Sequence, residues 1–435
     1  MRLREIGLAL LATALASCAS NEPPVGLLGA YELADGRTVS IRRSVDSTLR
    51  YRIFEDGGTG RLYDAGDNAF VSGPGFSSRE PVELNVEFVT DDLGIARSLT
   101  WSHNDASVQS GERIGTERNV WINSSGKRLH GRLHLPDSEP PFAAVVLVHG
   151  SGDSAGTEWL YNGDFFVANG FAVLTYDKRG SGKSEGKFTF DFQQLANDAS
   201  AAVEYLAAQP EIDAGRIGLS GYSQGAWVAP LATSRNDRIR FVLVNYGMIE
   251  SPAEEARLEM RQLLVDAGVP DGDLEEADEL IRASIEVVAS GLKCHWDQFE
   301  ELESKYGDAY WLQHLDGTPI DQLVSYPNWF VKLIGGWLLP RGLPWHYDSR
   351  DLLENSDVPM AWFLAGEDRS APNEGTIAIL EDLIERGKPY GLTVFPGADH
   401  GMVTFTGQGD DITYTGYVED YFRKEVEALE RLSAD

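Results

Sequence analysis

The chain has 435 residues, of which 42% are hydrophobic and 10% are aromatic. This composition excludes an intrinsically disordered protein, and the length allows two or three folded domains. Its 68 acidic residues outweigh 37 basic ones and give a formal net charge of −31. Because such a surface repels phosphate backbones, we expect no nucleic-acid partner.

The first residues have the pattern of an export signal. Arg2 and Arg4 precede an apolar run at residues 6–16, which is shorter than the roughly 20 residues of a membrane span. The run ends in "LASC", which resembles the lipobox of bacterial lipoproteins, where cleavage falls before the cysteine. The resemblance implies a signal peptide at 1–17, lipidation of Cys18, and export to the bacterial cell envelope at the periplasmic face or outer membrane. An ordinary signal peptide with an incidental cysteine is the alternative.

Cys18 and Cys294 are the two cysteines of the sequence. If Cys18 carries lipid, Cys294 has no partner within the chain, which excludes an intrachain disulfide. The lipid anchor is then the only membrane contact that we expect.

Residues 25–115 are predicted to form a small antiparallel β domain, as a sandwich or a barrel. Apolar and polar residues alternate in "TVSIRR", "LRYRIF" and "VELNVEF". Turn signals such as Asp35-Gly36 and Gly57-Gly58 separate these runs. The pattern indicates no function for this region.

The pattern changes after residue 119 to short apolar runs separated by helical stretches. Runs of this kind indicate a parallel sheet that helices cover on both faces. The sequence predicts a hairpin at 119–136 and a helix at 191–209. Six further strands are predicted at 143–150, 171–177, 216–221, 240–247, 360–366 and 392–397.

A single interruption of this alternation extends from residue 247 to residue 353. Ser251-Pro252-Ala253-Glu254 is a capping box that predicts a helix start, and a second helix is predicted at 273–291. The stretch is too long for a loop, so we expect a folded helical cap. Most of its five tryptophans should form the cap's own core: Trp296, Trp311, Trp329, Trp337 and Trp345.

The strand and helix patterns together divide the chain into six segments. These are a signal peptide (1–17), a tether (18–24), a β domain (25–115), a first core part (119–246), a cap (247–353) and a second core part (354–435).

Ser223 lies between two glycines where a strand pattern becomes a helix pattern. A serine hydroxyl needs a base and an oxyanion site to act as a nucleophile. In Gly-x-Ser-x-Gly, a sharp strand-to-helix turn exposes the serine oxygen above the sheet edge. The stretch Gly221-Tyr222-Ser223-Gln224-Gly225 fits this pattern and this position.

With this motif the chain resembles the α/β-hydrolase superfamily, in which the order is serine, acid, histidine. His400, in "FPGADHG", is the only histidine beyond the last candidate acid. The resemblance implies Asp368 as the acid, with Glu367 as the alternative, and leaves Asp399 to structure the loop. One oxyanion donor is the amide of Gln224, and resemblance to His-Gly-x-Gly hydrolases points to Ser151 for the other.

Three other features of the core have structural explanations. His149 precedes the oxyanion loop and should brace it. Residues 177–187 lack the first glycine of a Walker A motif, and they resemble the Asp-x-Arg-Gly-x-Gly-x-Ser loop of α/β-hydrolases. His130 and His134 have no third ligand nearby, so we expect them on the sheet surface and predict no metal site.

The resemblance covers residues 119–435 and implies acyl transfer to water without a metal or organic cofactor. We expect a carboxylesterase for small-molecule esters, similar to exported bacterial hydrolases of the dipeptidyl-peptidase-like or xylan-esterase-like branch. A serine peptidase for short peptides and a catalytically inactive binding protein are the alternatives. A peptidase would carry a carboxylate pair for the substrate's amino terminus, which the sequence does not reveal. The oligomeric state stays open.

Overall fold

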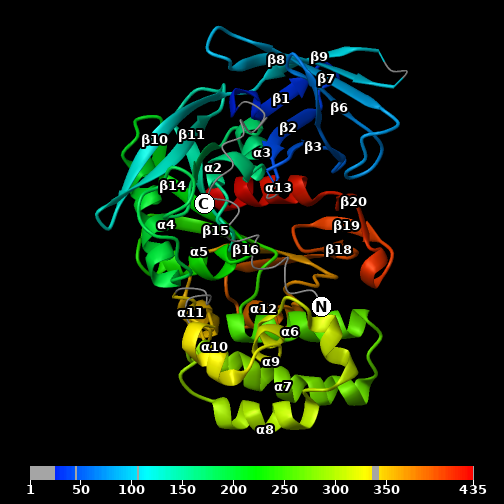
Figure 1. The fold of residues 1–435 in the computed structure, drawn as a ribbon. Coiled ribbons are helices and arrows are strands. Elements are labelled where there is room, and N and C mark those ends of the chain that lie inside the picture. Colours follow the sequence, from blue (N-terminus) through cyan, green and yellow to red (C-terminus); the bar gives the residue numbers. More distant parts are fainter. Residues whose placement is uncertain (1–24, 45–46, 105–106, 336–341, 435) are drawn as a thin grey trace.

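The structure of the protein is a computed structural model that describes residues 25–434, except 45–46, 105–106 and 336–341. The predicted signal peptide at 1–17 and the tether with Cys18 therefore lie outside the described residues. Figure 1 shows the N-terminal strands at one end, an α/β core in the middle and a helical insertion at the other end. Within the described part of the chain, no helix is both long enough and apolar enough to cross a membrane.

The N-terminal strands form one antiparallel sheet in the order β4-β3-β2-β1-β9-β8-β7-β6-β5. The sheet curls, which brings strands from its two ends together. A Cβ at Gly60 of β4 would lie only 2.7 Å from the hydroxyl of Ser72 in β6. Across the curl, the rings of Tyr51 and Trp101 meet edge-on at 5.2 Å. The region is thus a single antiparallel sheet that curls until its ends approach each other, which is closer to the predicted barrel than to the predicted sandwich. Its strands are β1 (Gly29–Leu33), β2 (Thr38–Arg43), β3 (Leu49–Ile53), β4 (Thr59–Arg61), β5 (Tyr63–Gly66), β6 (Ala69–Ser72), β7 (Leu84–Thr90), β8 (Ala96–His103) and β9 (Gln109–Arg113).

The core is built on an eight-stranded sheet in the order β10-β11-β13-β12-β14-β15-β16-β17. An antiparallel hairpin forms one edge, and the six strands from β12 to β17 are parallel. The predicted fold class is therefore confirmed. The strands are β10 (Thr116–Ser124), β11 (Lys127–Leu135), β12 (Phe142–Val148), β13 (Ala172–Tyr176), β14 (Ile212–Tyr222), β15 (Ile239–Asn245), β16 (Met360–Ala365) and β17 (Tyr390–Phe395).

Helices cover both faces of this sheet, as continuous apolar strands require. One face packs against α4 (Phe192–Ala207), α5 (Gly225–Thr233) and α12 (Glu374–Glu385). The other packs against α3 (Asn162–Ala168) and α13 (Tyr421–Ala434), which lie between the core sheet and the N-terminal sheet (Figure 1). A short helix, α2 (Gly156–Trp159), precedes α3.

The insertion is helical and has its own apolar core. Ser251 caps its first helix, accepting a hydrogen bond from the Glu254 amide at 3.3 Å. The second helix begins two residues before its predicted start. The elements are α6 (Pro252–Asp266), α7 (Asp271–Ala289), α8 (Trp296–Tyr306), η3 (Tyr310–Leu315), α9 (Pro319–Val324) and α10 (Asn328–Ile334), followed by α11 (Arg350–Asn355).

The tryptophans of the insertion have different environments. Trp296 and Trp311 are buried in its core, and Trp345 packs against that core. Trp329 is 68% exposed, and Trp337 lies outside the described residues. The expectation of a core role is therefore met by three of the four tryptophans that can be placed.

A small third sheet links the core to the N-terminal sheet. It consists of β18 (Ala398–Asp399), β19 (Val403–Thr406) and β20 (Thr413–Tyr417). The Tyr417 amide donates to the Gly57 carbonyl at 3.1 Å, and Arg52 Nε donates to the Tyr417 hydroxyl at 2.8 Å. The guanidinium of Arg52 also stacks over the ring of Tyr161.

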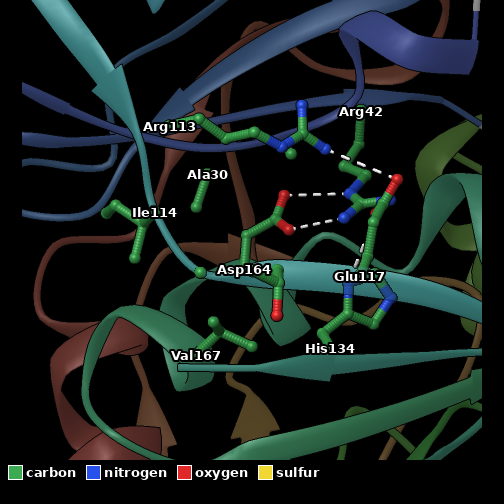
Figure 2. Close-up of a pocket in the computed structure, with 11 residues that line it drawn as sticks. Ala30, Arg42, Arg113, Ile114, Glu117, His134, Asp164 and Val167 are labelled. Atoms are coloured by element: carbon green, nitrogen blue, oxygen red, sulfur yellow. Dashed lines mark hydrogen bonds and ion pairs between the residues drawn. The ribbon is translucent and has the colours of Figure 1, made fainter. Parts of the chain in front are cut away.

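A buried ion pair joins the N-terminal sheet to α3. Arg42 donates to both oxygens of Asp164, at 2.9 and 2.6 Å, and Ser40 donates to the same carboxylate at 2.6 Å. Figure 2 shows the Arg42 and Asp164 side chains facing each other across this interface. The space left beside them is about 10 Å³, room for about one water molecule, so the cluster is packed as an interior.

Replacing Asp164 by alanine should lower the free energy of unfolding by about 3 kcal/mol, because it leaves a buried guanidinium without its counter-charge. Urea denaturation measures this change. Asp35→Ala is the control: the Asp35–Arg37 pair lies on the surface of the same sheet, and its loss should cost less than about 1 kcal/mol. Equal losses in the two variants would contradict the assigned role of the interface pair.

Candidate active site

Ser223 occupies the sharp turn between β14 and α5. Its φ is +52°, a left-handed conformation that costs a residue with a side chain about 1–3 kcal/mol. A Cβ at Gly221 would lie 2.3 Å from the Gly225 carbonyl oxygen, and one at Gly225 would lie 2.7 Å from that of Val148. No larger residue fits at either glycine, so the spacing of the motif follows from the close approach of β12, β14 and α5.

The structure brings Ser223, His400 and Asp368 together. His400 Nε2 lies 3.1 Å from Ser223 Oγ, and His400 Nδ1 lies 3.0 and 3.1 Å from the two oxygens of Asp368. The three residues come from the turn after β14, the turn after β18 and the loop after β16. Parallel strands end at the same sheet edge, which is why such distant residues meet there.

Asp368 is held in place by its own loop. The amides of Ser370 and Ala371 donate to its Oδ1 at 3.1 and 2.8 Å, and its side chain is fully buried. Glu367, the alternative acid, is exposed instead and lines a cavity of about 480 Å³ between α6 and the loop after β19. Of the two carboxylates, the structure places Asp368 against the imidazole.

The charges around His400 favour its protonated form. Burial alone would lower the pKa of His400, but the charge and hydrogen bond of Asp368 raise it to about 9, with smaller contributions from Glu255 and Asp399. The imidazole is therefore well placed to carry a positive charge. A base that takes a proton from a serine must do this during the reaction.

Asp399 structures the loop that carries the histidine, as expected from the sequence. Its Oδ1 accepts hydrogen bonds from the His400 amide at 2.8 Å and the Arg369 amide at 3.0 Å. The Arg369 guanidinium binds its other oxygen, which also accepts from the Tyr414 hydroxyl at 3.2 Å. The acid loop and the histidine loop are thereby tied to each other.

The residues predicted for the oxyanion site flank the nucleophile. The loop that carries Ser151 touches Ser223, since a Cβ at Gly150 would lie 3.4 Å from the Ser223 Cβ. Gln224 is the N-cap of α5, and amides at a helix start have no partner within the helix. Gln224 and the loop that carries Ser151 therefore both lie beside the nucleophile.

Of the predictions about core histidines, the one for His130 and His134 needs correction. His149 braces the loop by packing alone: its ring meets Tyr176 edge-on at 5.1 Å, and neither ring nitrogen has a hydrogen-bond partner among the described residues. His130 and His134 are buried, although the sequence placed them on the sheet surface. His130 Nδ1 lies 2.9 Å from Asp177, whose loop folds back over β11 and covers it.

The loop at 177–187 is a structural element. The Asp177 carboxylate accepts hydrogen bonds from the Thr157 hydroxyl at 2.7 Å and the Lys183 amide at 3.0 Å. Arg179 forms a buried ion pair with Asp198 of α4. Among the residues that the structure describes, no group of three or more potential metal ligands comes together.

Sequence reasoning missed two groups near the triad. Lys178 is fully buried beneath the oxyanion loop. Glu255 and Glu259 lie one turn apart on α6 and therefore share a face. The only signals in the sequence were a lysine inside the Asp-x-Arg-Gly-x-Gly-x-Ser loop and the i, i+4 spacing of the glutamates, and neither shows which residues lie nearby in space.

The charges of the triad affect the pKa values of the two glutamates of α6. Burial raises the pKa of Glu255 to about 8, while the charge of His400 opposes the shift. The pKa of Glu259 is also raised by burial, with His400 opposing and Asp368 adding to the shift. Both glutamates are therefore close enough to the triad for its charges to affect their pKa values.

Comparison with known proteins gives a match to one family. Residues 125–275 match the X-Pro dipeptidyl-peptidase (S15) family. This segment includes the oxyanion loop, the loop at 177–187, the nucleophile turn and the start of the insertion.

Individual relatives match over different lengths. A thiohydrolase, aneE, from Aspergillus aculeatus is 31% identical over 137 residues, covering 31% of this chain and 42% of its own. The chain thus spans about two-fifths of that relative's length. A bifunctional esterase/perhydrolase from Acinetobacter calcoaceticus is 23% identical and is covered over 90% of its length and 62% of this chain. Among solved structures, the α/β hydrolase GrgF from Penicillium sp. sh18 aligns with a TM-score of 0.44 and 19% identity, over 74% of this chain and 100% of its own.

Replacing Asp368 by asparagine should lower kcat by about 10⁴-fold, because an amide cannot stabilise the imidazolium or hold the required tautomer. It should also lower the pKa of His400, since the carboxylate raises that pKa. The imidazole must be neutral to accept a proton, so the acid limb of kcat/KM for a p-nitrophenyl ester should move to lower pH. Glu367→Gln is the matched control and should leave both rate and profile close to wild type. A large loss in Glu367→Gln instead would make Glu367 the acid.

Proposed function

This chain belongs to the α/β-hydrolase superfamily, and we propose that it is a serine hydrolase that cleaves small carboxylic esters through an acyl-enzyme intermediate. The observation that carries the proposal is the continuous contact from Ser223 Oγ through the His400 imidazole to Asp368. The bifunctional esterase/perhydrolase relative, aligned over most of its length, supports ester cleavage.

In the proposed reaction, His400 Nε2 accepts the proton of Ser223 as its oxygen attacks the ester carbonyl. Asp368 stays ionised, keeps the imidazole proton on Nδ1 and stabilises the imidazolium. The amides of Ser151 and Gln224 donate to the oxyanion of the tetrahedral intermediate. His400 then gives its proton to the leaving alcohol, and Ser223 retains the acyl group.

Deacylation repeats these steps in reverse with water. His400 takes a proton from the water as its oxygen attacks the acyl-enzyme, and returns that proton to Ser223 when the acid leaves. Every proton in the cycle moves among side chains, substrate and water. The reaction therefore consumes one water for each ester and has no step for a metal or organic cofactor.

A fluorophosphonate probe tests the proposal directly, because it reacts with an activated serine. The wild-type protein should be labelled, and Ser223→Ala should not be labelled although it folds normally. Ser220→Ala is a control on the same strand, since Ser220 is fully buried and should leave labelling intact. Absence of labelling in folded wild-type protein would favour a catalytically inactive binding protein on the same fold.

One observation favours the alternative of a serine peptidase. Glu255 and Glu259 share one face of α6, and the charge of His400 acts on the pKa of both. A pair of carboxylates near the triad is what capture of a substrate's amino terminus requires. A panel of p-nitrophenyl esters of increasing acyl length, assayed beside dipeptide anilides with free and blocked amino termini, separates the two functions. Ester turnover without anilide turnover supports the esterase, and faster cleavage of the free-amine anilides supports the peptidase.

We also propose that the chain is exported and lipidated at Cys18, with its membrane contact limited to that anchor. The short apolar run and the "LASC" sequence support this proposal. When the full gene is expressed in a bacterium, the protein should incorporate labelled palmitate and partition into detergent, whereas Cys18→Ser should do neither. Cys294→Ser is the control, because Cys294 is an exposed free thiol far along the chain. Unlabelled wild-type protein would leave an ordinary signal peptide as the explanation.

A further inference from the structure

Lys178 is a buried amine that the proposed reaction does not use. It follows β13 in the loop at 177–187, and its side chain is fully buried. Its Nζ donates to the Gly150 carbonyl at 2.6 Å and to the Gln224 side-chain oxygen at 3.1 Å. The rings of Phe188 and Phe190 lie 5.1 and 5.7 Å from the ammonium.

These partners of Lys178 are all uncharged. Among the ion pairs of the described residues, none includes Lys178. Burial accordingly lowers the pKa of Lys178 to about 7, against an opposing contribution from Asp153. An amine held in such a place destabilises the fold relative to an apolar side chain of the same size, so its contribution to stability does not explain its presence.

The two oxygens that Lys178 binds belong to the two halves of the oxyanion site. The Gly150 carbonyl is part of the peptide whose N–H is that of Ser151. This peptide bond is trans, and in a trans peptide the C=O and N–H point in opposite directions. With the carbonyl fixed on Lys178, the Ser151 N–H points away from the lysine, in a loop that lies against Ser223.

The second bond of Lys178 anchors the other donor residue. Gln224 supplies its backbone N–H at the start of α5, and its buried side chain binds Lys178. A single ammonium thus connects Gly150–Ser151 with Gln224. Because hydrogen bonds in a row polarise each other, the bond to the Gly150 carbonyl also makes the N–H of the same peptide a stronger donor.

From this geometry we infer that Lys178 is a positioning residue for the oxyanion site, which orients the Ser151 and Gln224 amides toward the tetrahedral intermediate. The inference rests on the proposed function. It adds that the loop at 177–187, besides its structural contacts, sets the strength of transition-state binding. Lys178 touches neither the substrate nor the reacting atoms.

The variant Lys178→Met keeps an unbranched side chain that is one atom shorter and removes its charge and hydrogen bonds. We expect kcat for a p-nitrophenyl ester to fall about 100-fold, the effect of losing one oxyanion donor, while KM changes less than about threefold. Affinity for a trifluoromethyl ketone, which forms a tetrahedral adduct with the serine, should fall by a similar factor. The melting temperature should stay equal or rise, because a buried amine has been replaced by an apolar side chain.

Two further variants complete the series. Lys178→Gln retains an uncharged donor and should recover part of kcat and of the trifluoromethyl ketone affinity. Lys183→Met removes an exposed lysine of the same loop and should behave as wild type. If Lys178→Met does not fold, Lys178→Gln decides: reduced kcat with unchanged KM and melting temperature supports the inference.

Two outcomes would overturn the inference. One is a Lys178→Met enzyme with wild-type kcat and wild-type affinity for the trifluoromethyl ketone. The other is a loss of kcat that is matched by a lower melting temperature and a higher KM, which a purely structural role predicts. Fluorophosphonate labelling separates failure of this inference from failure of the proposed function. If the wild-type protein is labelled and Lys178→Met keeps wild-type kcat and affinity, only the role of Lys178 is refuted.

Discussion

The close approach of β12, β14 and α5 around Ser223 is the constraint on which the site depends. At Gly221 and Gly225, neighbouring backbone atoms occupy the position that a Cβ would take. Only residues without a side chain therefore fit on the two sides of this turn. The turn forces Ser223 into a left-handed conformation and fixes its oxygen above the sheet edge. Everything else in the site is arranged around an oxygen whose position the backbone has already determined.

The order of the strands brings the remaining groups to that oxygen. Because β14, β16 and β17 are parallel, the loops that follow them open at the same edge. Asp368 and His400 therefore reach Ser223 although 145 and 177 residues of sequence separate them from it. The cap inserted after β15 begins at this edge too, and the charge of Glu255 on its first helix contributes to the raised pKa of His400.

The sequence was informative where local pattern determines structure. The apolar runs predicted all six parallel strands, the capping box predicted the start of α6, and the motif around Ser223 predicted the turn. The resemblance favoured Asp368 over Glu367, but it left Glu367 open because the two residues are adjacent in the sequence. One points to the imidazole and the other to a cavity.

What could not be predicted depends on contacts between distant segments. A lysine in a polar loop is exposed in most proteins, and only the fold shows that the oxyanion loop and two phenylalanines cover Lys178. His130 was expected on the sheet surface because no third metal ligand lies near it in the sequence, yet the loop after β13 covers it. The alternation in the N-terminal strands indicated a sheet but gave no information on how that sheet curls.

The links between the N-terminal sheet and the core bear on how the protein can be divided. β20 belongs to the same small sheet as the turn that carries His400, and it is held from outside the core by the Gly57 carbonyl and by Arg52. Removing the N-terminal strands would expose the Asp164 carboxylate and the Tyr161 ring to solvent. It would also expose one edge of the small sheet β18-β19-β20, in which His400 follows β18. The catalytic unit therefore does not coincide with the segment that resembles a hydrolase. Its boundary includes the curled sheet, because Arg52 of β3 and Gly57, in the turn that follows β3, hold β20.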